Sequence, residues 1–228
     1  MSSYSAIERN VRALLEAVPE GVTVVGAVKT RSPDEVRAAV GAGLRHIGHN
    51  YVQEAEAMRA ACGFDSGVVW HGIGHIQRRK ARKSVQLFDL VETVDSIALG
   101  LALQRAAEAE GKALPVLVEV NSGVEEAKAG VHPDQALDLI RSLVALPNLR
   151  VQGLMTLGPA DTDAEGLRAA FRLTRQLFEA VASVEGAAPL HLSMGMSSSW
   201  EVAVEEGATS IRVGTSLFGA RAPRGVTP

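Results

Sequence analysis

Eight short runs of apolar and β-branched residues recur along the 228-residue chain, and helical patterns separate most of them. Runs of this length and composition indicate strands that are buried on both faces. Strands of this kind that alternate with helices predict a parallel sheet covered by helices. The predicted strands are Val22–Val28, Leu44–Ile47, Val68–Trp70, Leu90–Val94, Leu114–Val120, Val151–Met155, Leu190–Leu192 and Ser210–Val213.

The signals for helix starts and stops agree with this alternation. Ser32 is followed by Pro33 and, three residues on, by Glu35, which is the spacing of a capping box at a helix start. The amphipathic pattern of the first 18 residues predicts an extra N-terminal helix. The capping spacing recurs at Thr162 with Glu165 and at Ser198 with Glu201, and glycines that can end helices stand at Gly43, Gly111 and Gly207.

The number of strands favours a closed barrel. Eight parallel strands with intervening helices form a (β/α)8 TIM barrel, and about 250 residues is the usual length of that fold. We therefore predict an α/β protein in which residues 1–228 form a single barrel domain. An open doubly wound sheet is the alternative, but its glycine-rich nucleotide fingerprint does not follow the first predicted strand.

Composition excludes several classes of function. The net charge of −3 gives no general affinity for nucleic acid, and we interpret the basic run at 78–83 as a solvated helix face. The single cysteine, Cys62, excludes an internal disulfide framework and fits a reducing compartment. No signal peptide or apolar stretch of about 20 residues is present, so a cytoplasmic protein without a membrane span is expected.

Lys29 stands at the end of the first predicted strand, where the active sites of barrel enzymes lie. Only five of the 23 basic residues are lysine. An arginine would serve if only a positive charge were needed, whereas a desolvated lysine amine can attack a carbonyl group. The alternative is a lysine that buries its stem and keeps its head in water. Position alone leaves both interpretations open.

The ends of the seventh and eighth strands carry small and hydroxylated residues. Glycine lets backbone N–H groups approach an oxyanion, and serine and threonine can donate to it. Each such residue could alone be an ordinary turn or cap residue, but strand one adjoins strand eight in a closed barrel. A phosphate site that faces an amine able to react with an aldehyde fits the cofactor pyridoxal 5'-phosphate. Arg212 is suited to the pyridine nitrogen of that cofactor. The candidate phosphate residues are Ser193, Gly195, Ser197, Gly214 and Thr215.

The chain resembles the pyridoxal phosphate homeostasis protein family in a series of stretches. These relatives are single-domain versions of the alanine racemase barrel, of fold-type III. The resemblance runs from about residue 5 to Arg221 and rests on "AVKTRSPDEV", "HIGHNYVQEA", "WHGIGHIQRRK", "VLVEVNSGVEEAKAGV", "VQGLMTLGP" and "LSMGMSSSWEVAVEEGATSIRVGTSLFGAR".

The resemblance implies which residues hold the cofactor. Lys29 would carry it as an imine, and Arg212 would lie beside the ring nitrogen. Ser193, Gly214 and Thr215 would bind the phosphate.

Two further residues, Asn50 and His71, are assigned less directly. Asn50 would face the same mouth of the barrel, although it could equally be a helix cap with Gln53 three residues on. His71, at the end of the third strand, is predicted to contact the cofactor ring. The chain departs from the family at His49, where an acid is usual, and in the basic stretch "GHIQRRK".

The histidines do not form a metal motif. His71 and His75 are four residues apart, but Gly72 and Gly74 between them speak against a helix. No set of cysteines or carboxylates completes a site, so no metal is predicted.

The predicted role is that of a carrier or buffer in intracellular vitamin B6 homeostasis rather than that of an enzyme. A two-base racemase needs a second base, which fold-type III enzymes take as a tyrosine from a further domain across a dimer. Tyr4 and Tyr51 are the only tyrosines here, and an arginine at the ring nitrogen weakens the electron sink. A small racemase that uses Lys29 as its only base is the alternative, and a barrel without ligand is a third possibility. The expected protein is a monomer whose partners could be apo-enzymes that need the cofactor.

Overall fold

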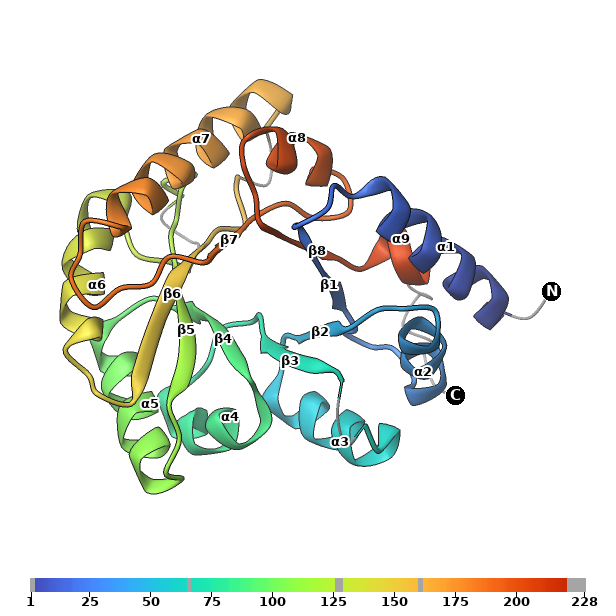
Figure 1. Cartoon of the computed structure of the whole chain (residues 1–228), viewed down its shortest axis with the longest axis horizontal. Coiled ribbons are helices and arrows are strands. Elements are labelled where there is room, and N and C mark those ends of the chain that lie inside the picture. Colours follow the sequence, from blue (N-terminus) through green and yellow to red (C-terminus); the bar gives the residue numbers. More distant parts are fainter. Residues whose placement is uncertain (1–2, 65–66, 126–128, 160–161, 221–228) are drawn as a thin grey trace, which may run out of the picture.

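The computed structural model describes residues 3–64, 67–125, 129–159 and 162–220. Eight parallel strands pair in sequence order, and β1 (Thr23–Ala27) also pairs with β8 (Ser210–Val213), which closes the sheet into a barrel. Figure 1 shows the helices as an outer ring around this barrel. The predicted (β/α)8 barrel with an extra N-terminal helix is confirmed.

The remaining elements alternate as the sequence indicated. The other strands are β2 (His46–His49), β3 (Val69–Gly72), β4 (Leu90–Val94), β5 (Leu114–Glu119), β6 (Leu149–Met155) and β7 (His191–Ser193). The helices are α1 (Ser3–Ala17), α2 (Pro33–Gly41), α3 (Val52–Cys62), α4 (Ala81–Leu87), α5 (Ile97–Ala109), α6 (Ala136–Val144), α7 (Ala164–Val181), α8 (Trp200–Glu205) and α9 (Thr215–Phe218), with 3-10 turns at Arg78–Lys80 and Pro133–Gln135.

The predicted second strand, Leu44–Ile47, is displaced by two residues from the observed strand β2. The Leu44 amide donates to the carbonyl of Ala39 at 3.1 Å, so Leu44 closes the end of α2 instead of starting β2. The strand contains two histidines, and the ring of His46 contacts His71 inside the barrel. The apolar pattern ends at Ile47, so it does not reveal that the strand continues through Gly48 and His49.

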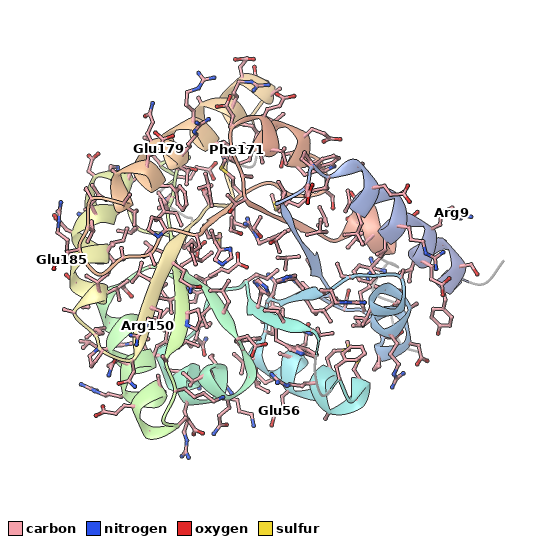
Figure 2. All side chains as sticks on the ribbon, viewed as in Figure 1. Arg9, Glu56, Arg150, Phe171, Glu179 and Glu185 are labelled. Atoms are coloured by element: carbon pink, nitrogen blue, oxygen red, sulfur yellow. The ribbon has the colours of Figure 1, made fainter. Side chains whose placement is uncertain are left out.

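The core has an outer and an inner part. The outer part fills the space between strands and helices, where Phe171 of α7 is fully buried. Charged side chains such as Arg9 and Glu56 stand on the outer side of the helices (Figure 2). Inside the barrel, Leu90, Leu117 and Met155 form a small separate apolar cluster. Several polar side chains of the strands, among them Glu92, Ser193 and Arg212, are buried as well.

The helix caps agree with the sequence in one case and differ in two. Ser32 forms the predicted capping box, because its hydroxyl accepts from the Glu35 amide and Glu35 accepts from the Ser32 amide. The cap predicted at Thr162 is wrong, since Asp163 accepts from the amide of Gly166 at 2.9 Å. The cap predicted at Ser198 is also wrong, because α8 begins one residue later than the spacing requires.

The N-terminal helix α1 packs on the barrel beside α2 and α9. The Asn10 side chain donates to the carbonyl of Leu217 at 3.1 Å, which ties α1 to the segment that follows β8. Among the residues described above, no helix is both long and apolar enough to cross a bilayer.

Candidate functional site

A cavity of about 310 Å³ opens at the carboxyl ends of the strands. Loops after β1, β2, β3, β6, β7 and β8 contribute to it, which places it where barrel enzymes bind their ligands. Its lining residues are Ala27, Lys29, Arg31, Asn50, Ile73, Leu157, Met196, Ser197, Ser198, Arg212, Gly214 and Thr215. Five of the seven predicted site residues are thus brought together in one cavity.

Lys29 lies two residues beyond β1 and is half-buried. Its Nζ is 3.5 Å from the Tyr51 hydroxyl and 5.0 Å from the centre of the Tyr51 ring. Within the described part of the chain Lys29 forms no ion pair, so no carboxylate holds its amine. The amine is therefore available to react with a ligand in the cavity.

The loop that carries Lys29 is fixed on both sides. Thr30 has a φ of 65°, in the left-handed region that a β-branched residue rarely adopts. Arg31 holds this conformation by donating to the carbonyls of Phe218 at 3.2 Å and Gly219 at 2.7 Å, and by pairing with Glu35 at 3.4 Å. The first loop of the barrel is thereby joined to the last one.

Two backbone N–H groups converge on one oxygen at the mouth of β8. The amides of Gly214 and Ser216 both donate to the hydroxyl of Ser197, at 3.1 Å and 3.2 Å. A side chain at position 214 would put its Cβ 3.3 Å from the carbonyl oxygen of Ala27, so glycine allows β1 and β8 to approach closely there. Converging backbone donors of this kind favour an anion.

Arg212 of β8 is almost fully buried in the wall of the barrel. It donates to the Ser193 hydroxyl at 2.6 Å and to the carbonyl of Thr156 at 2.8 Å. The Ser193 hydroxyl in turn donates to Glu92 at 2.6 Å. Ser193 therefore lies beneath the cavity and does not line it, although the resemblance placed it at the phosphate.

Glu92 of β4 connects these groups to two histidines. Its other carboxylate oxygen is 2.6 Å from Nδ1 of His71, and Nε2 of His71 is 2.9 Å from Nδ1 of His46. Both ring nitrogens of His71 are thus occupied inside the barrel. His71 is not among the residues that line the cavity, and its contact with the cofactor ring stays a prediction.

The buried charges balance one another. Burial alone would raise the pKa of Glu92, but the hydrogen bond and charge of His71, the charge of Arg212 and the hydrogen bond of Ser193 together lower it. Burial lowers the pKa of Arg212, and the two acids Glu92 and Glu119 oppose that shift. The arginine keeps its proton because its ordinary pKa is so high.

Burial shifts the pKa values of two further barrel residues toward their uncharged forms. Burial lowers the pKa of His46 to about 4, and the charges of His71 and His191 act in the same direction. Burial raises the pKa of Glu119 to about 7, to which Asp95 contributes and which Arg212 opposes. Glu92 is therefore the main counter-charge of Arg212 at neutral pH.

Asn50 follows β2 directly and lines the cavity with Lys29. The alternative that Asn50 caps the next helix is wrong, because α3 begins after Tyr51, whose side chain makes no cap hydrogen bond. The Asn50 side chain forms no hydrogen bond to another described residue. A ligand in the cavity could form hydrogen bonds with the Asn50 side-chain amide.

The sequence interpretation missed the residues that support the site. Glu92 is the only charged residue in the buried run "LVETV", and a lone acid in a run of that kind is a signal that could have found it. Thr156 and the supporting function of Ser193 carry no such signal. Among the described residues, no group of three or more histidines, cysteines and carboxylates could hold a metal ion.

Comparison with known proteins places the chain among close relatives. The family model of the alanine racemase N-terminal domain matches residues 2–222. The pyridoxal phosphate homeostasis protein of Aquifex aeolicus is 39% identical over 202 residues, which cover 87% of this chain and 86% of that protein. The protein of the same name from Escherichia coli is 35% identical over 208 residues, with coverages of 89% and 87%.

Solved structures also include proteins that are similar to this chain. PipY of Synechococcus elongatus, determined with PLP bound, has a TM-score of 0.86 and 35% identity over 93% of this chain and 100% of that one. Its structure without PLP has a TM-score of 0.89 and 36% identity, with the same coverages. Alanine racemase of Clostridium difficile, at 12% identity and a TM-score of 0.79, shares the fold over 58% of its length.

Proposed function

The chain belongs to the pyridoxal phosphate homeostasis protein family, and on that premise we propose that it binds pyridoxal 5'-phosphate covalently through Lys29 and acts as an intracellular carrier or buffer of this cofactor. One observation carries the proposal. The Lys29 amine, which forms no ion pair with another described residue, lines the same cavity as Ser197, Gly214 and Thr215, and the loops of Lys29 and Gly214 follow the adjoining strands β1 and β8.

The described residues fit the cofactor. When bound, the cofactor supplies an aldehyde that reacts with amines and a phosphate that needs donors. Lys29 offers the amine. The hydroxyls of Ser197 and Thr215 offer the donors, and the Gly214 and Ser216 amides orient the Ser197 hydroxyl by donating to its oxygen.

Arg212 is assigned to the ring nitrogen, and Ser193 and His71 to its support. Two donor groups of Arg212 are fixed by Ser193 and Thr156, which leaves its other N–H groups for the cavity. Ser193 and His71 hold the carboxylate that balances its charge. We therefore move Ser193 from the phosphate to this supporting role and propose Ser197 as the phosphate serine.

The cavity is built for holding the cofactor more than for proton transfer. Among its described lining residues, Lys29 is the only side chain that can act as a base near neutral pH. The nearest additional candidate, the hydroxyl of Tyr51, lies beside the Lys29 amine at 3.5 Å, so both groups share one position. Removing a proton from one face of a substrate and returning it to the other needs two separate positions.

The proposal extends to the cellular setting. We propose a cytoplasmic monomer made of a single barrel domain, which limits free cofactor or passes it to apo-enzymes. The half-buried Lys29 at an open mouth supports exchange, because an incoming amine can reach the covalent link there.

Thr215→Ala is expected to weaken binding of pyridoxal 5'-phosphate by about tenfold or more, because a hydrogen bond to a charged group contributes roughly 1.5–3 kcal/mol. The affinity for unphosphorylated pyridoxal should hardly change. Spectroscopic titration of both ligands measures the two dissociation constants. Ser142→Ala, which removes an exposed hydroxyl on α6, is the matched control. An equal loss for both ligands would assign Thr215 to the fold.

Alanine racemisation should not be measurable, whereas cofactor transfer should. Protein loaded with the cofactor is expected to restore activity to an apo-enzyme that needs it, after both have been mixed and free cofactor has been removed. Incubation with D- or L-alanine in deuterated water should give no multiple-turnover exchange at Cα. If such exchange occurred and were lost in Lys29→Ala, the protein would be a small racemase rather than a carrier. If only the transfer assay failed, the protein would be a buffer that holds the cofactor without delivering it to apo-enzymes.

A further inference from the structure

A second cavity, of about 470 Å³, lies outside the barrel, where α3 faces the loop after β1 and the start of α2. Its volume is within the range of small-molecule sites. Most of its wall is apolar, formed by Val28, Pro33, Ala57, Met58 and Ala61. It shares only Arg31 with the cavity that contains Lys29, so the two are neighbouring but distinct sites.

His49 lines this second cavity and has no partner for either ring nitrogen. The side chain is 1% exposed, and its ring stacks on Trp70 with centroids 5.6 Å apart and an angle of 10° between the planes. Burial lowers the pKa of His49 to about 4, so the imidazole is neutral and offers one donor and one acceptor. Buried polar groups in folded proteins are normally paired, so this unpaired ring can bind a ligand.

The charges at the rim select against an anion. The Arg31 guanidinium is already used by Glu35 and by the carbonyls of Phe218 and Gly219. Glu54 also lines the cavity and forms no ion pair with another described residue. Its carboxylate repels negatively charged ligands but does not repel neutral or cationic ones.

We propose that this cavity is an effector site for a small molecule with an apolar ring, one hydrogen-bonding group and no negative charge, held by His49. The cavity is lined by Val28 and Thr30, the immediate neighbours of Lys29 in the chain, and by Arg31, which follows Thr30. A bound effector therefore contacts the segment that positions the Lys29 amine. Its occupancy alters cofactor affinity, and the cofactor alters effector affinity by the same factor. This coupling rests on the proposed function, whereas the binding site itself does not.

Indole serves as the probe for binding, and it is added to the protein without cofactor. The ring ¹⁵N signals of His49, assigned by their loss in His49→Phe, should shift with saturation as indole is added. Indole-3-acetate, which carries a carboxylate, should bind at least about tenfold more weakly.

Ala57→Phe provides the decisive variant. Ala57 is exposed on α3 and lines the cavity, so a larger side chain fills the site without disturbing the core. The indole shift should disappear in Ala57→Phe and persist in Ala13→Phe, an exposed position on α1. No saturable shift of His49, or the same shift in Ala57→Phe, would overturn the site.

The coupling is measured by titrating the cofactor with and without saturating indole. We expect the dissociation constant to change with indole in the wild-type protein and not in Ala57→Phe. An unchanged constant in the wild type would overturn the effector role. Failure of the protein to hold the cofactor at all would contradict the proposed function instead, because indole binding is measured without cofactor.

Discussion

Glu92→Gln is expected to lower the free energy of unfolding of the cofactor-free protein by about 3–5 kcal/mol, the usual cost of leaving one member of a buried ion pair without its partner. Glu92 is fully buried, and through Ser193 it faces the buried guanidinium of Arg212. Glutamine keeps the shape but removes the charge and replaces one of the two acceptor oxygens by an NH2 donor. Glu119 replaces only part of that charge at neutral pH, because burial raises its pKa to about 7 and the group is then only partly ionised.

Urea denaturation at pH 7 measures the effect, with Glu16→Gln on the exposed face of α1 as the control. The control should leave the free energy of unfolding nearly unchanged. The double variant Glu92→Gln/Arg212→Leu should recover part of the loss, because the uncompensated charge is gone. If Glu92→Gln were as stable as the control, Glu92 would not be the counter-charge of Arg212.

The loss of stability at acid pH should also depend on the Glu92 carboxylate. The pKa of Glu92 is lower in the folded protein than its ordinary value, so the stability that Glu92 contributes is complete above that ordinary value, 4.5. This contribution is lost as the pH falls through the lowered, folded-state pKa. Glu92→Gln should therefore lose less stability than the wild type between pH 5 and the acid limit, as followed by denaturation at each pH.

The sequence predicts the barrel well because its strands are buried on both faces. Leu90–Val94 and Ser210–Val213 have the predicted bounds, since their residues are fully buried whichever way they point. The predicted strands Val68–Trp70 and Leu190–Leu192 stop before His71 and Ser193, two polar residues that lie in β3 and β7 of the structure. Inward side chains of a barrel can be polar when they pair with one another, and a linear pattern does not show such pairs.

The site was predicted less completely, and the two serines show why. Ser193 ends β7 and Ser197 lies beyond a turn at Gly195, whose φ is 93°. That turn brings Ser197 to the amides of Gly214 and Ser216, while Ser193 stays within the barrel wall. Spacing along the chain does not indicate which serine reaches the cavity, because the direction of the turn decides it. Glu92 comes from a distant strand and is found only once the barrel closes.

Lys29→Ala is expected to abolish the covalent link to the cofactor and with it the visible absorbance of the loaded protein. Among the described residues, Lys29 is the only lysine that lines the cavity, and its Nζ forms no ion pair with any of them. Some cofactor should remain through the phosphate donors alone. Lys112→Ala is the control, because Lys112 lies outside the cavity and contacts the carbonyl of Val85 at 3.4 Å. A spectrum unchanged in Lys29→Ala would assign the link to another amine.

Borohydride reduction of the loaded protein, followed by peptide mass mapping, locates that link directly. We expect the pyridoxyl group on the peptide that contains Lys29 in the wild type and in Lys112→Ala, and on no peptide in stoichiometric amount in Lys29→Ala. An adduct confined to Lys80, Lys83, Lys112 or Lys128, of which Lys128 lies outside the described residues, and equally abundant in Lys29→Ala, would contradict the assignment of Lys29 as the residue that holds the cofactor.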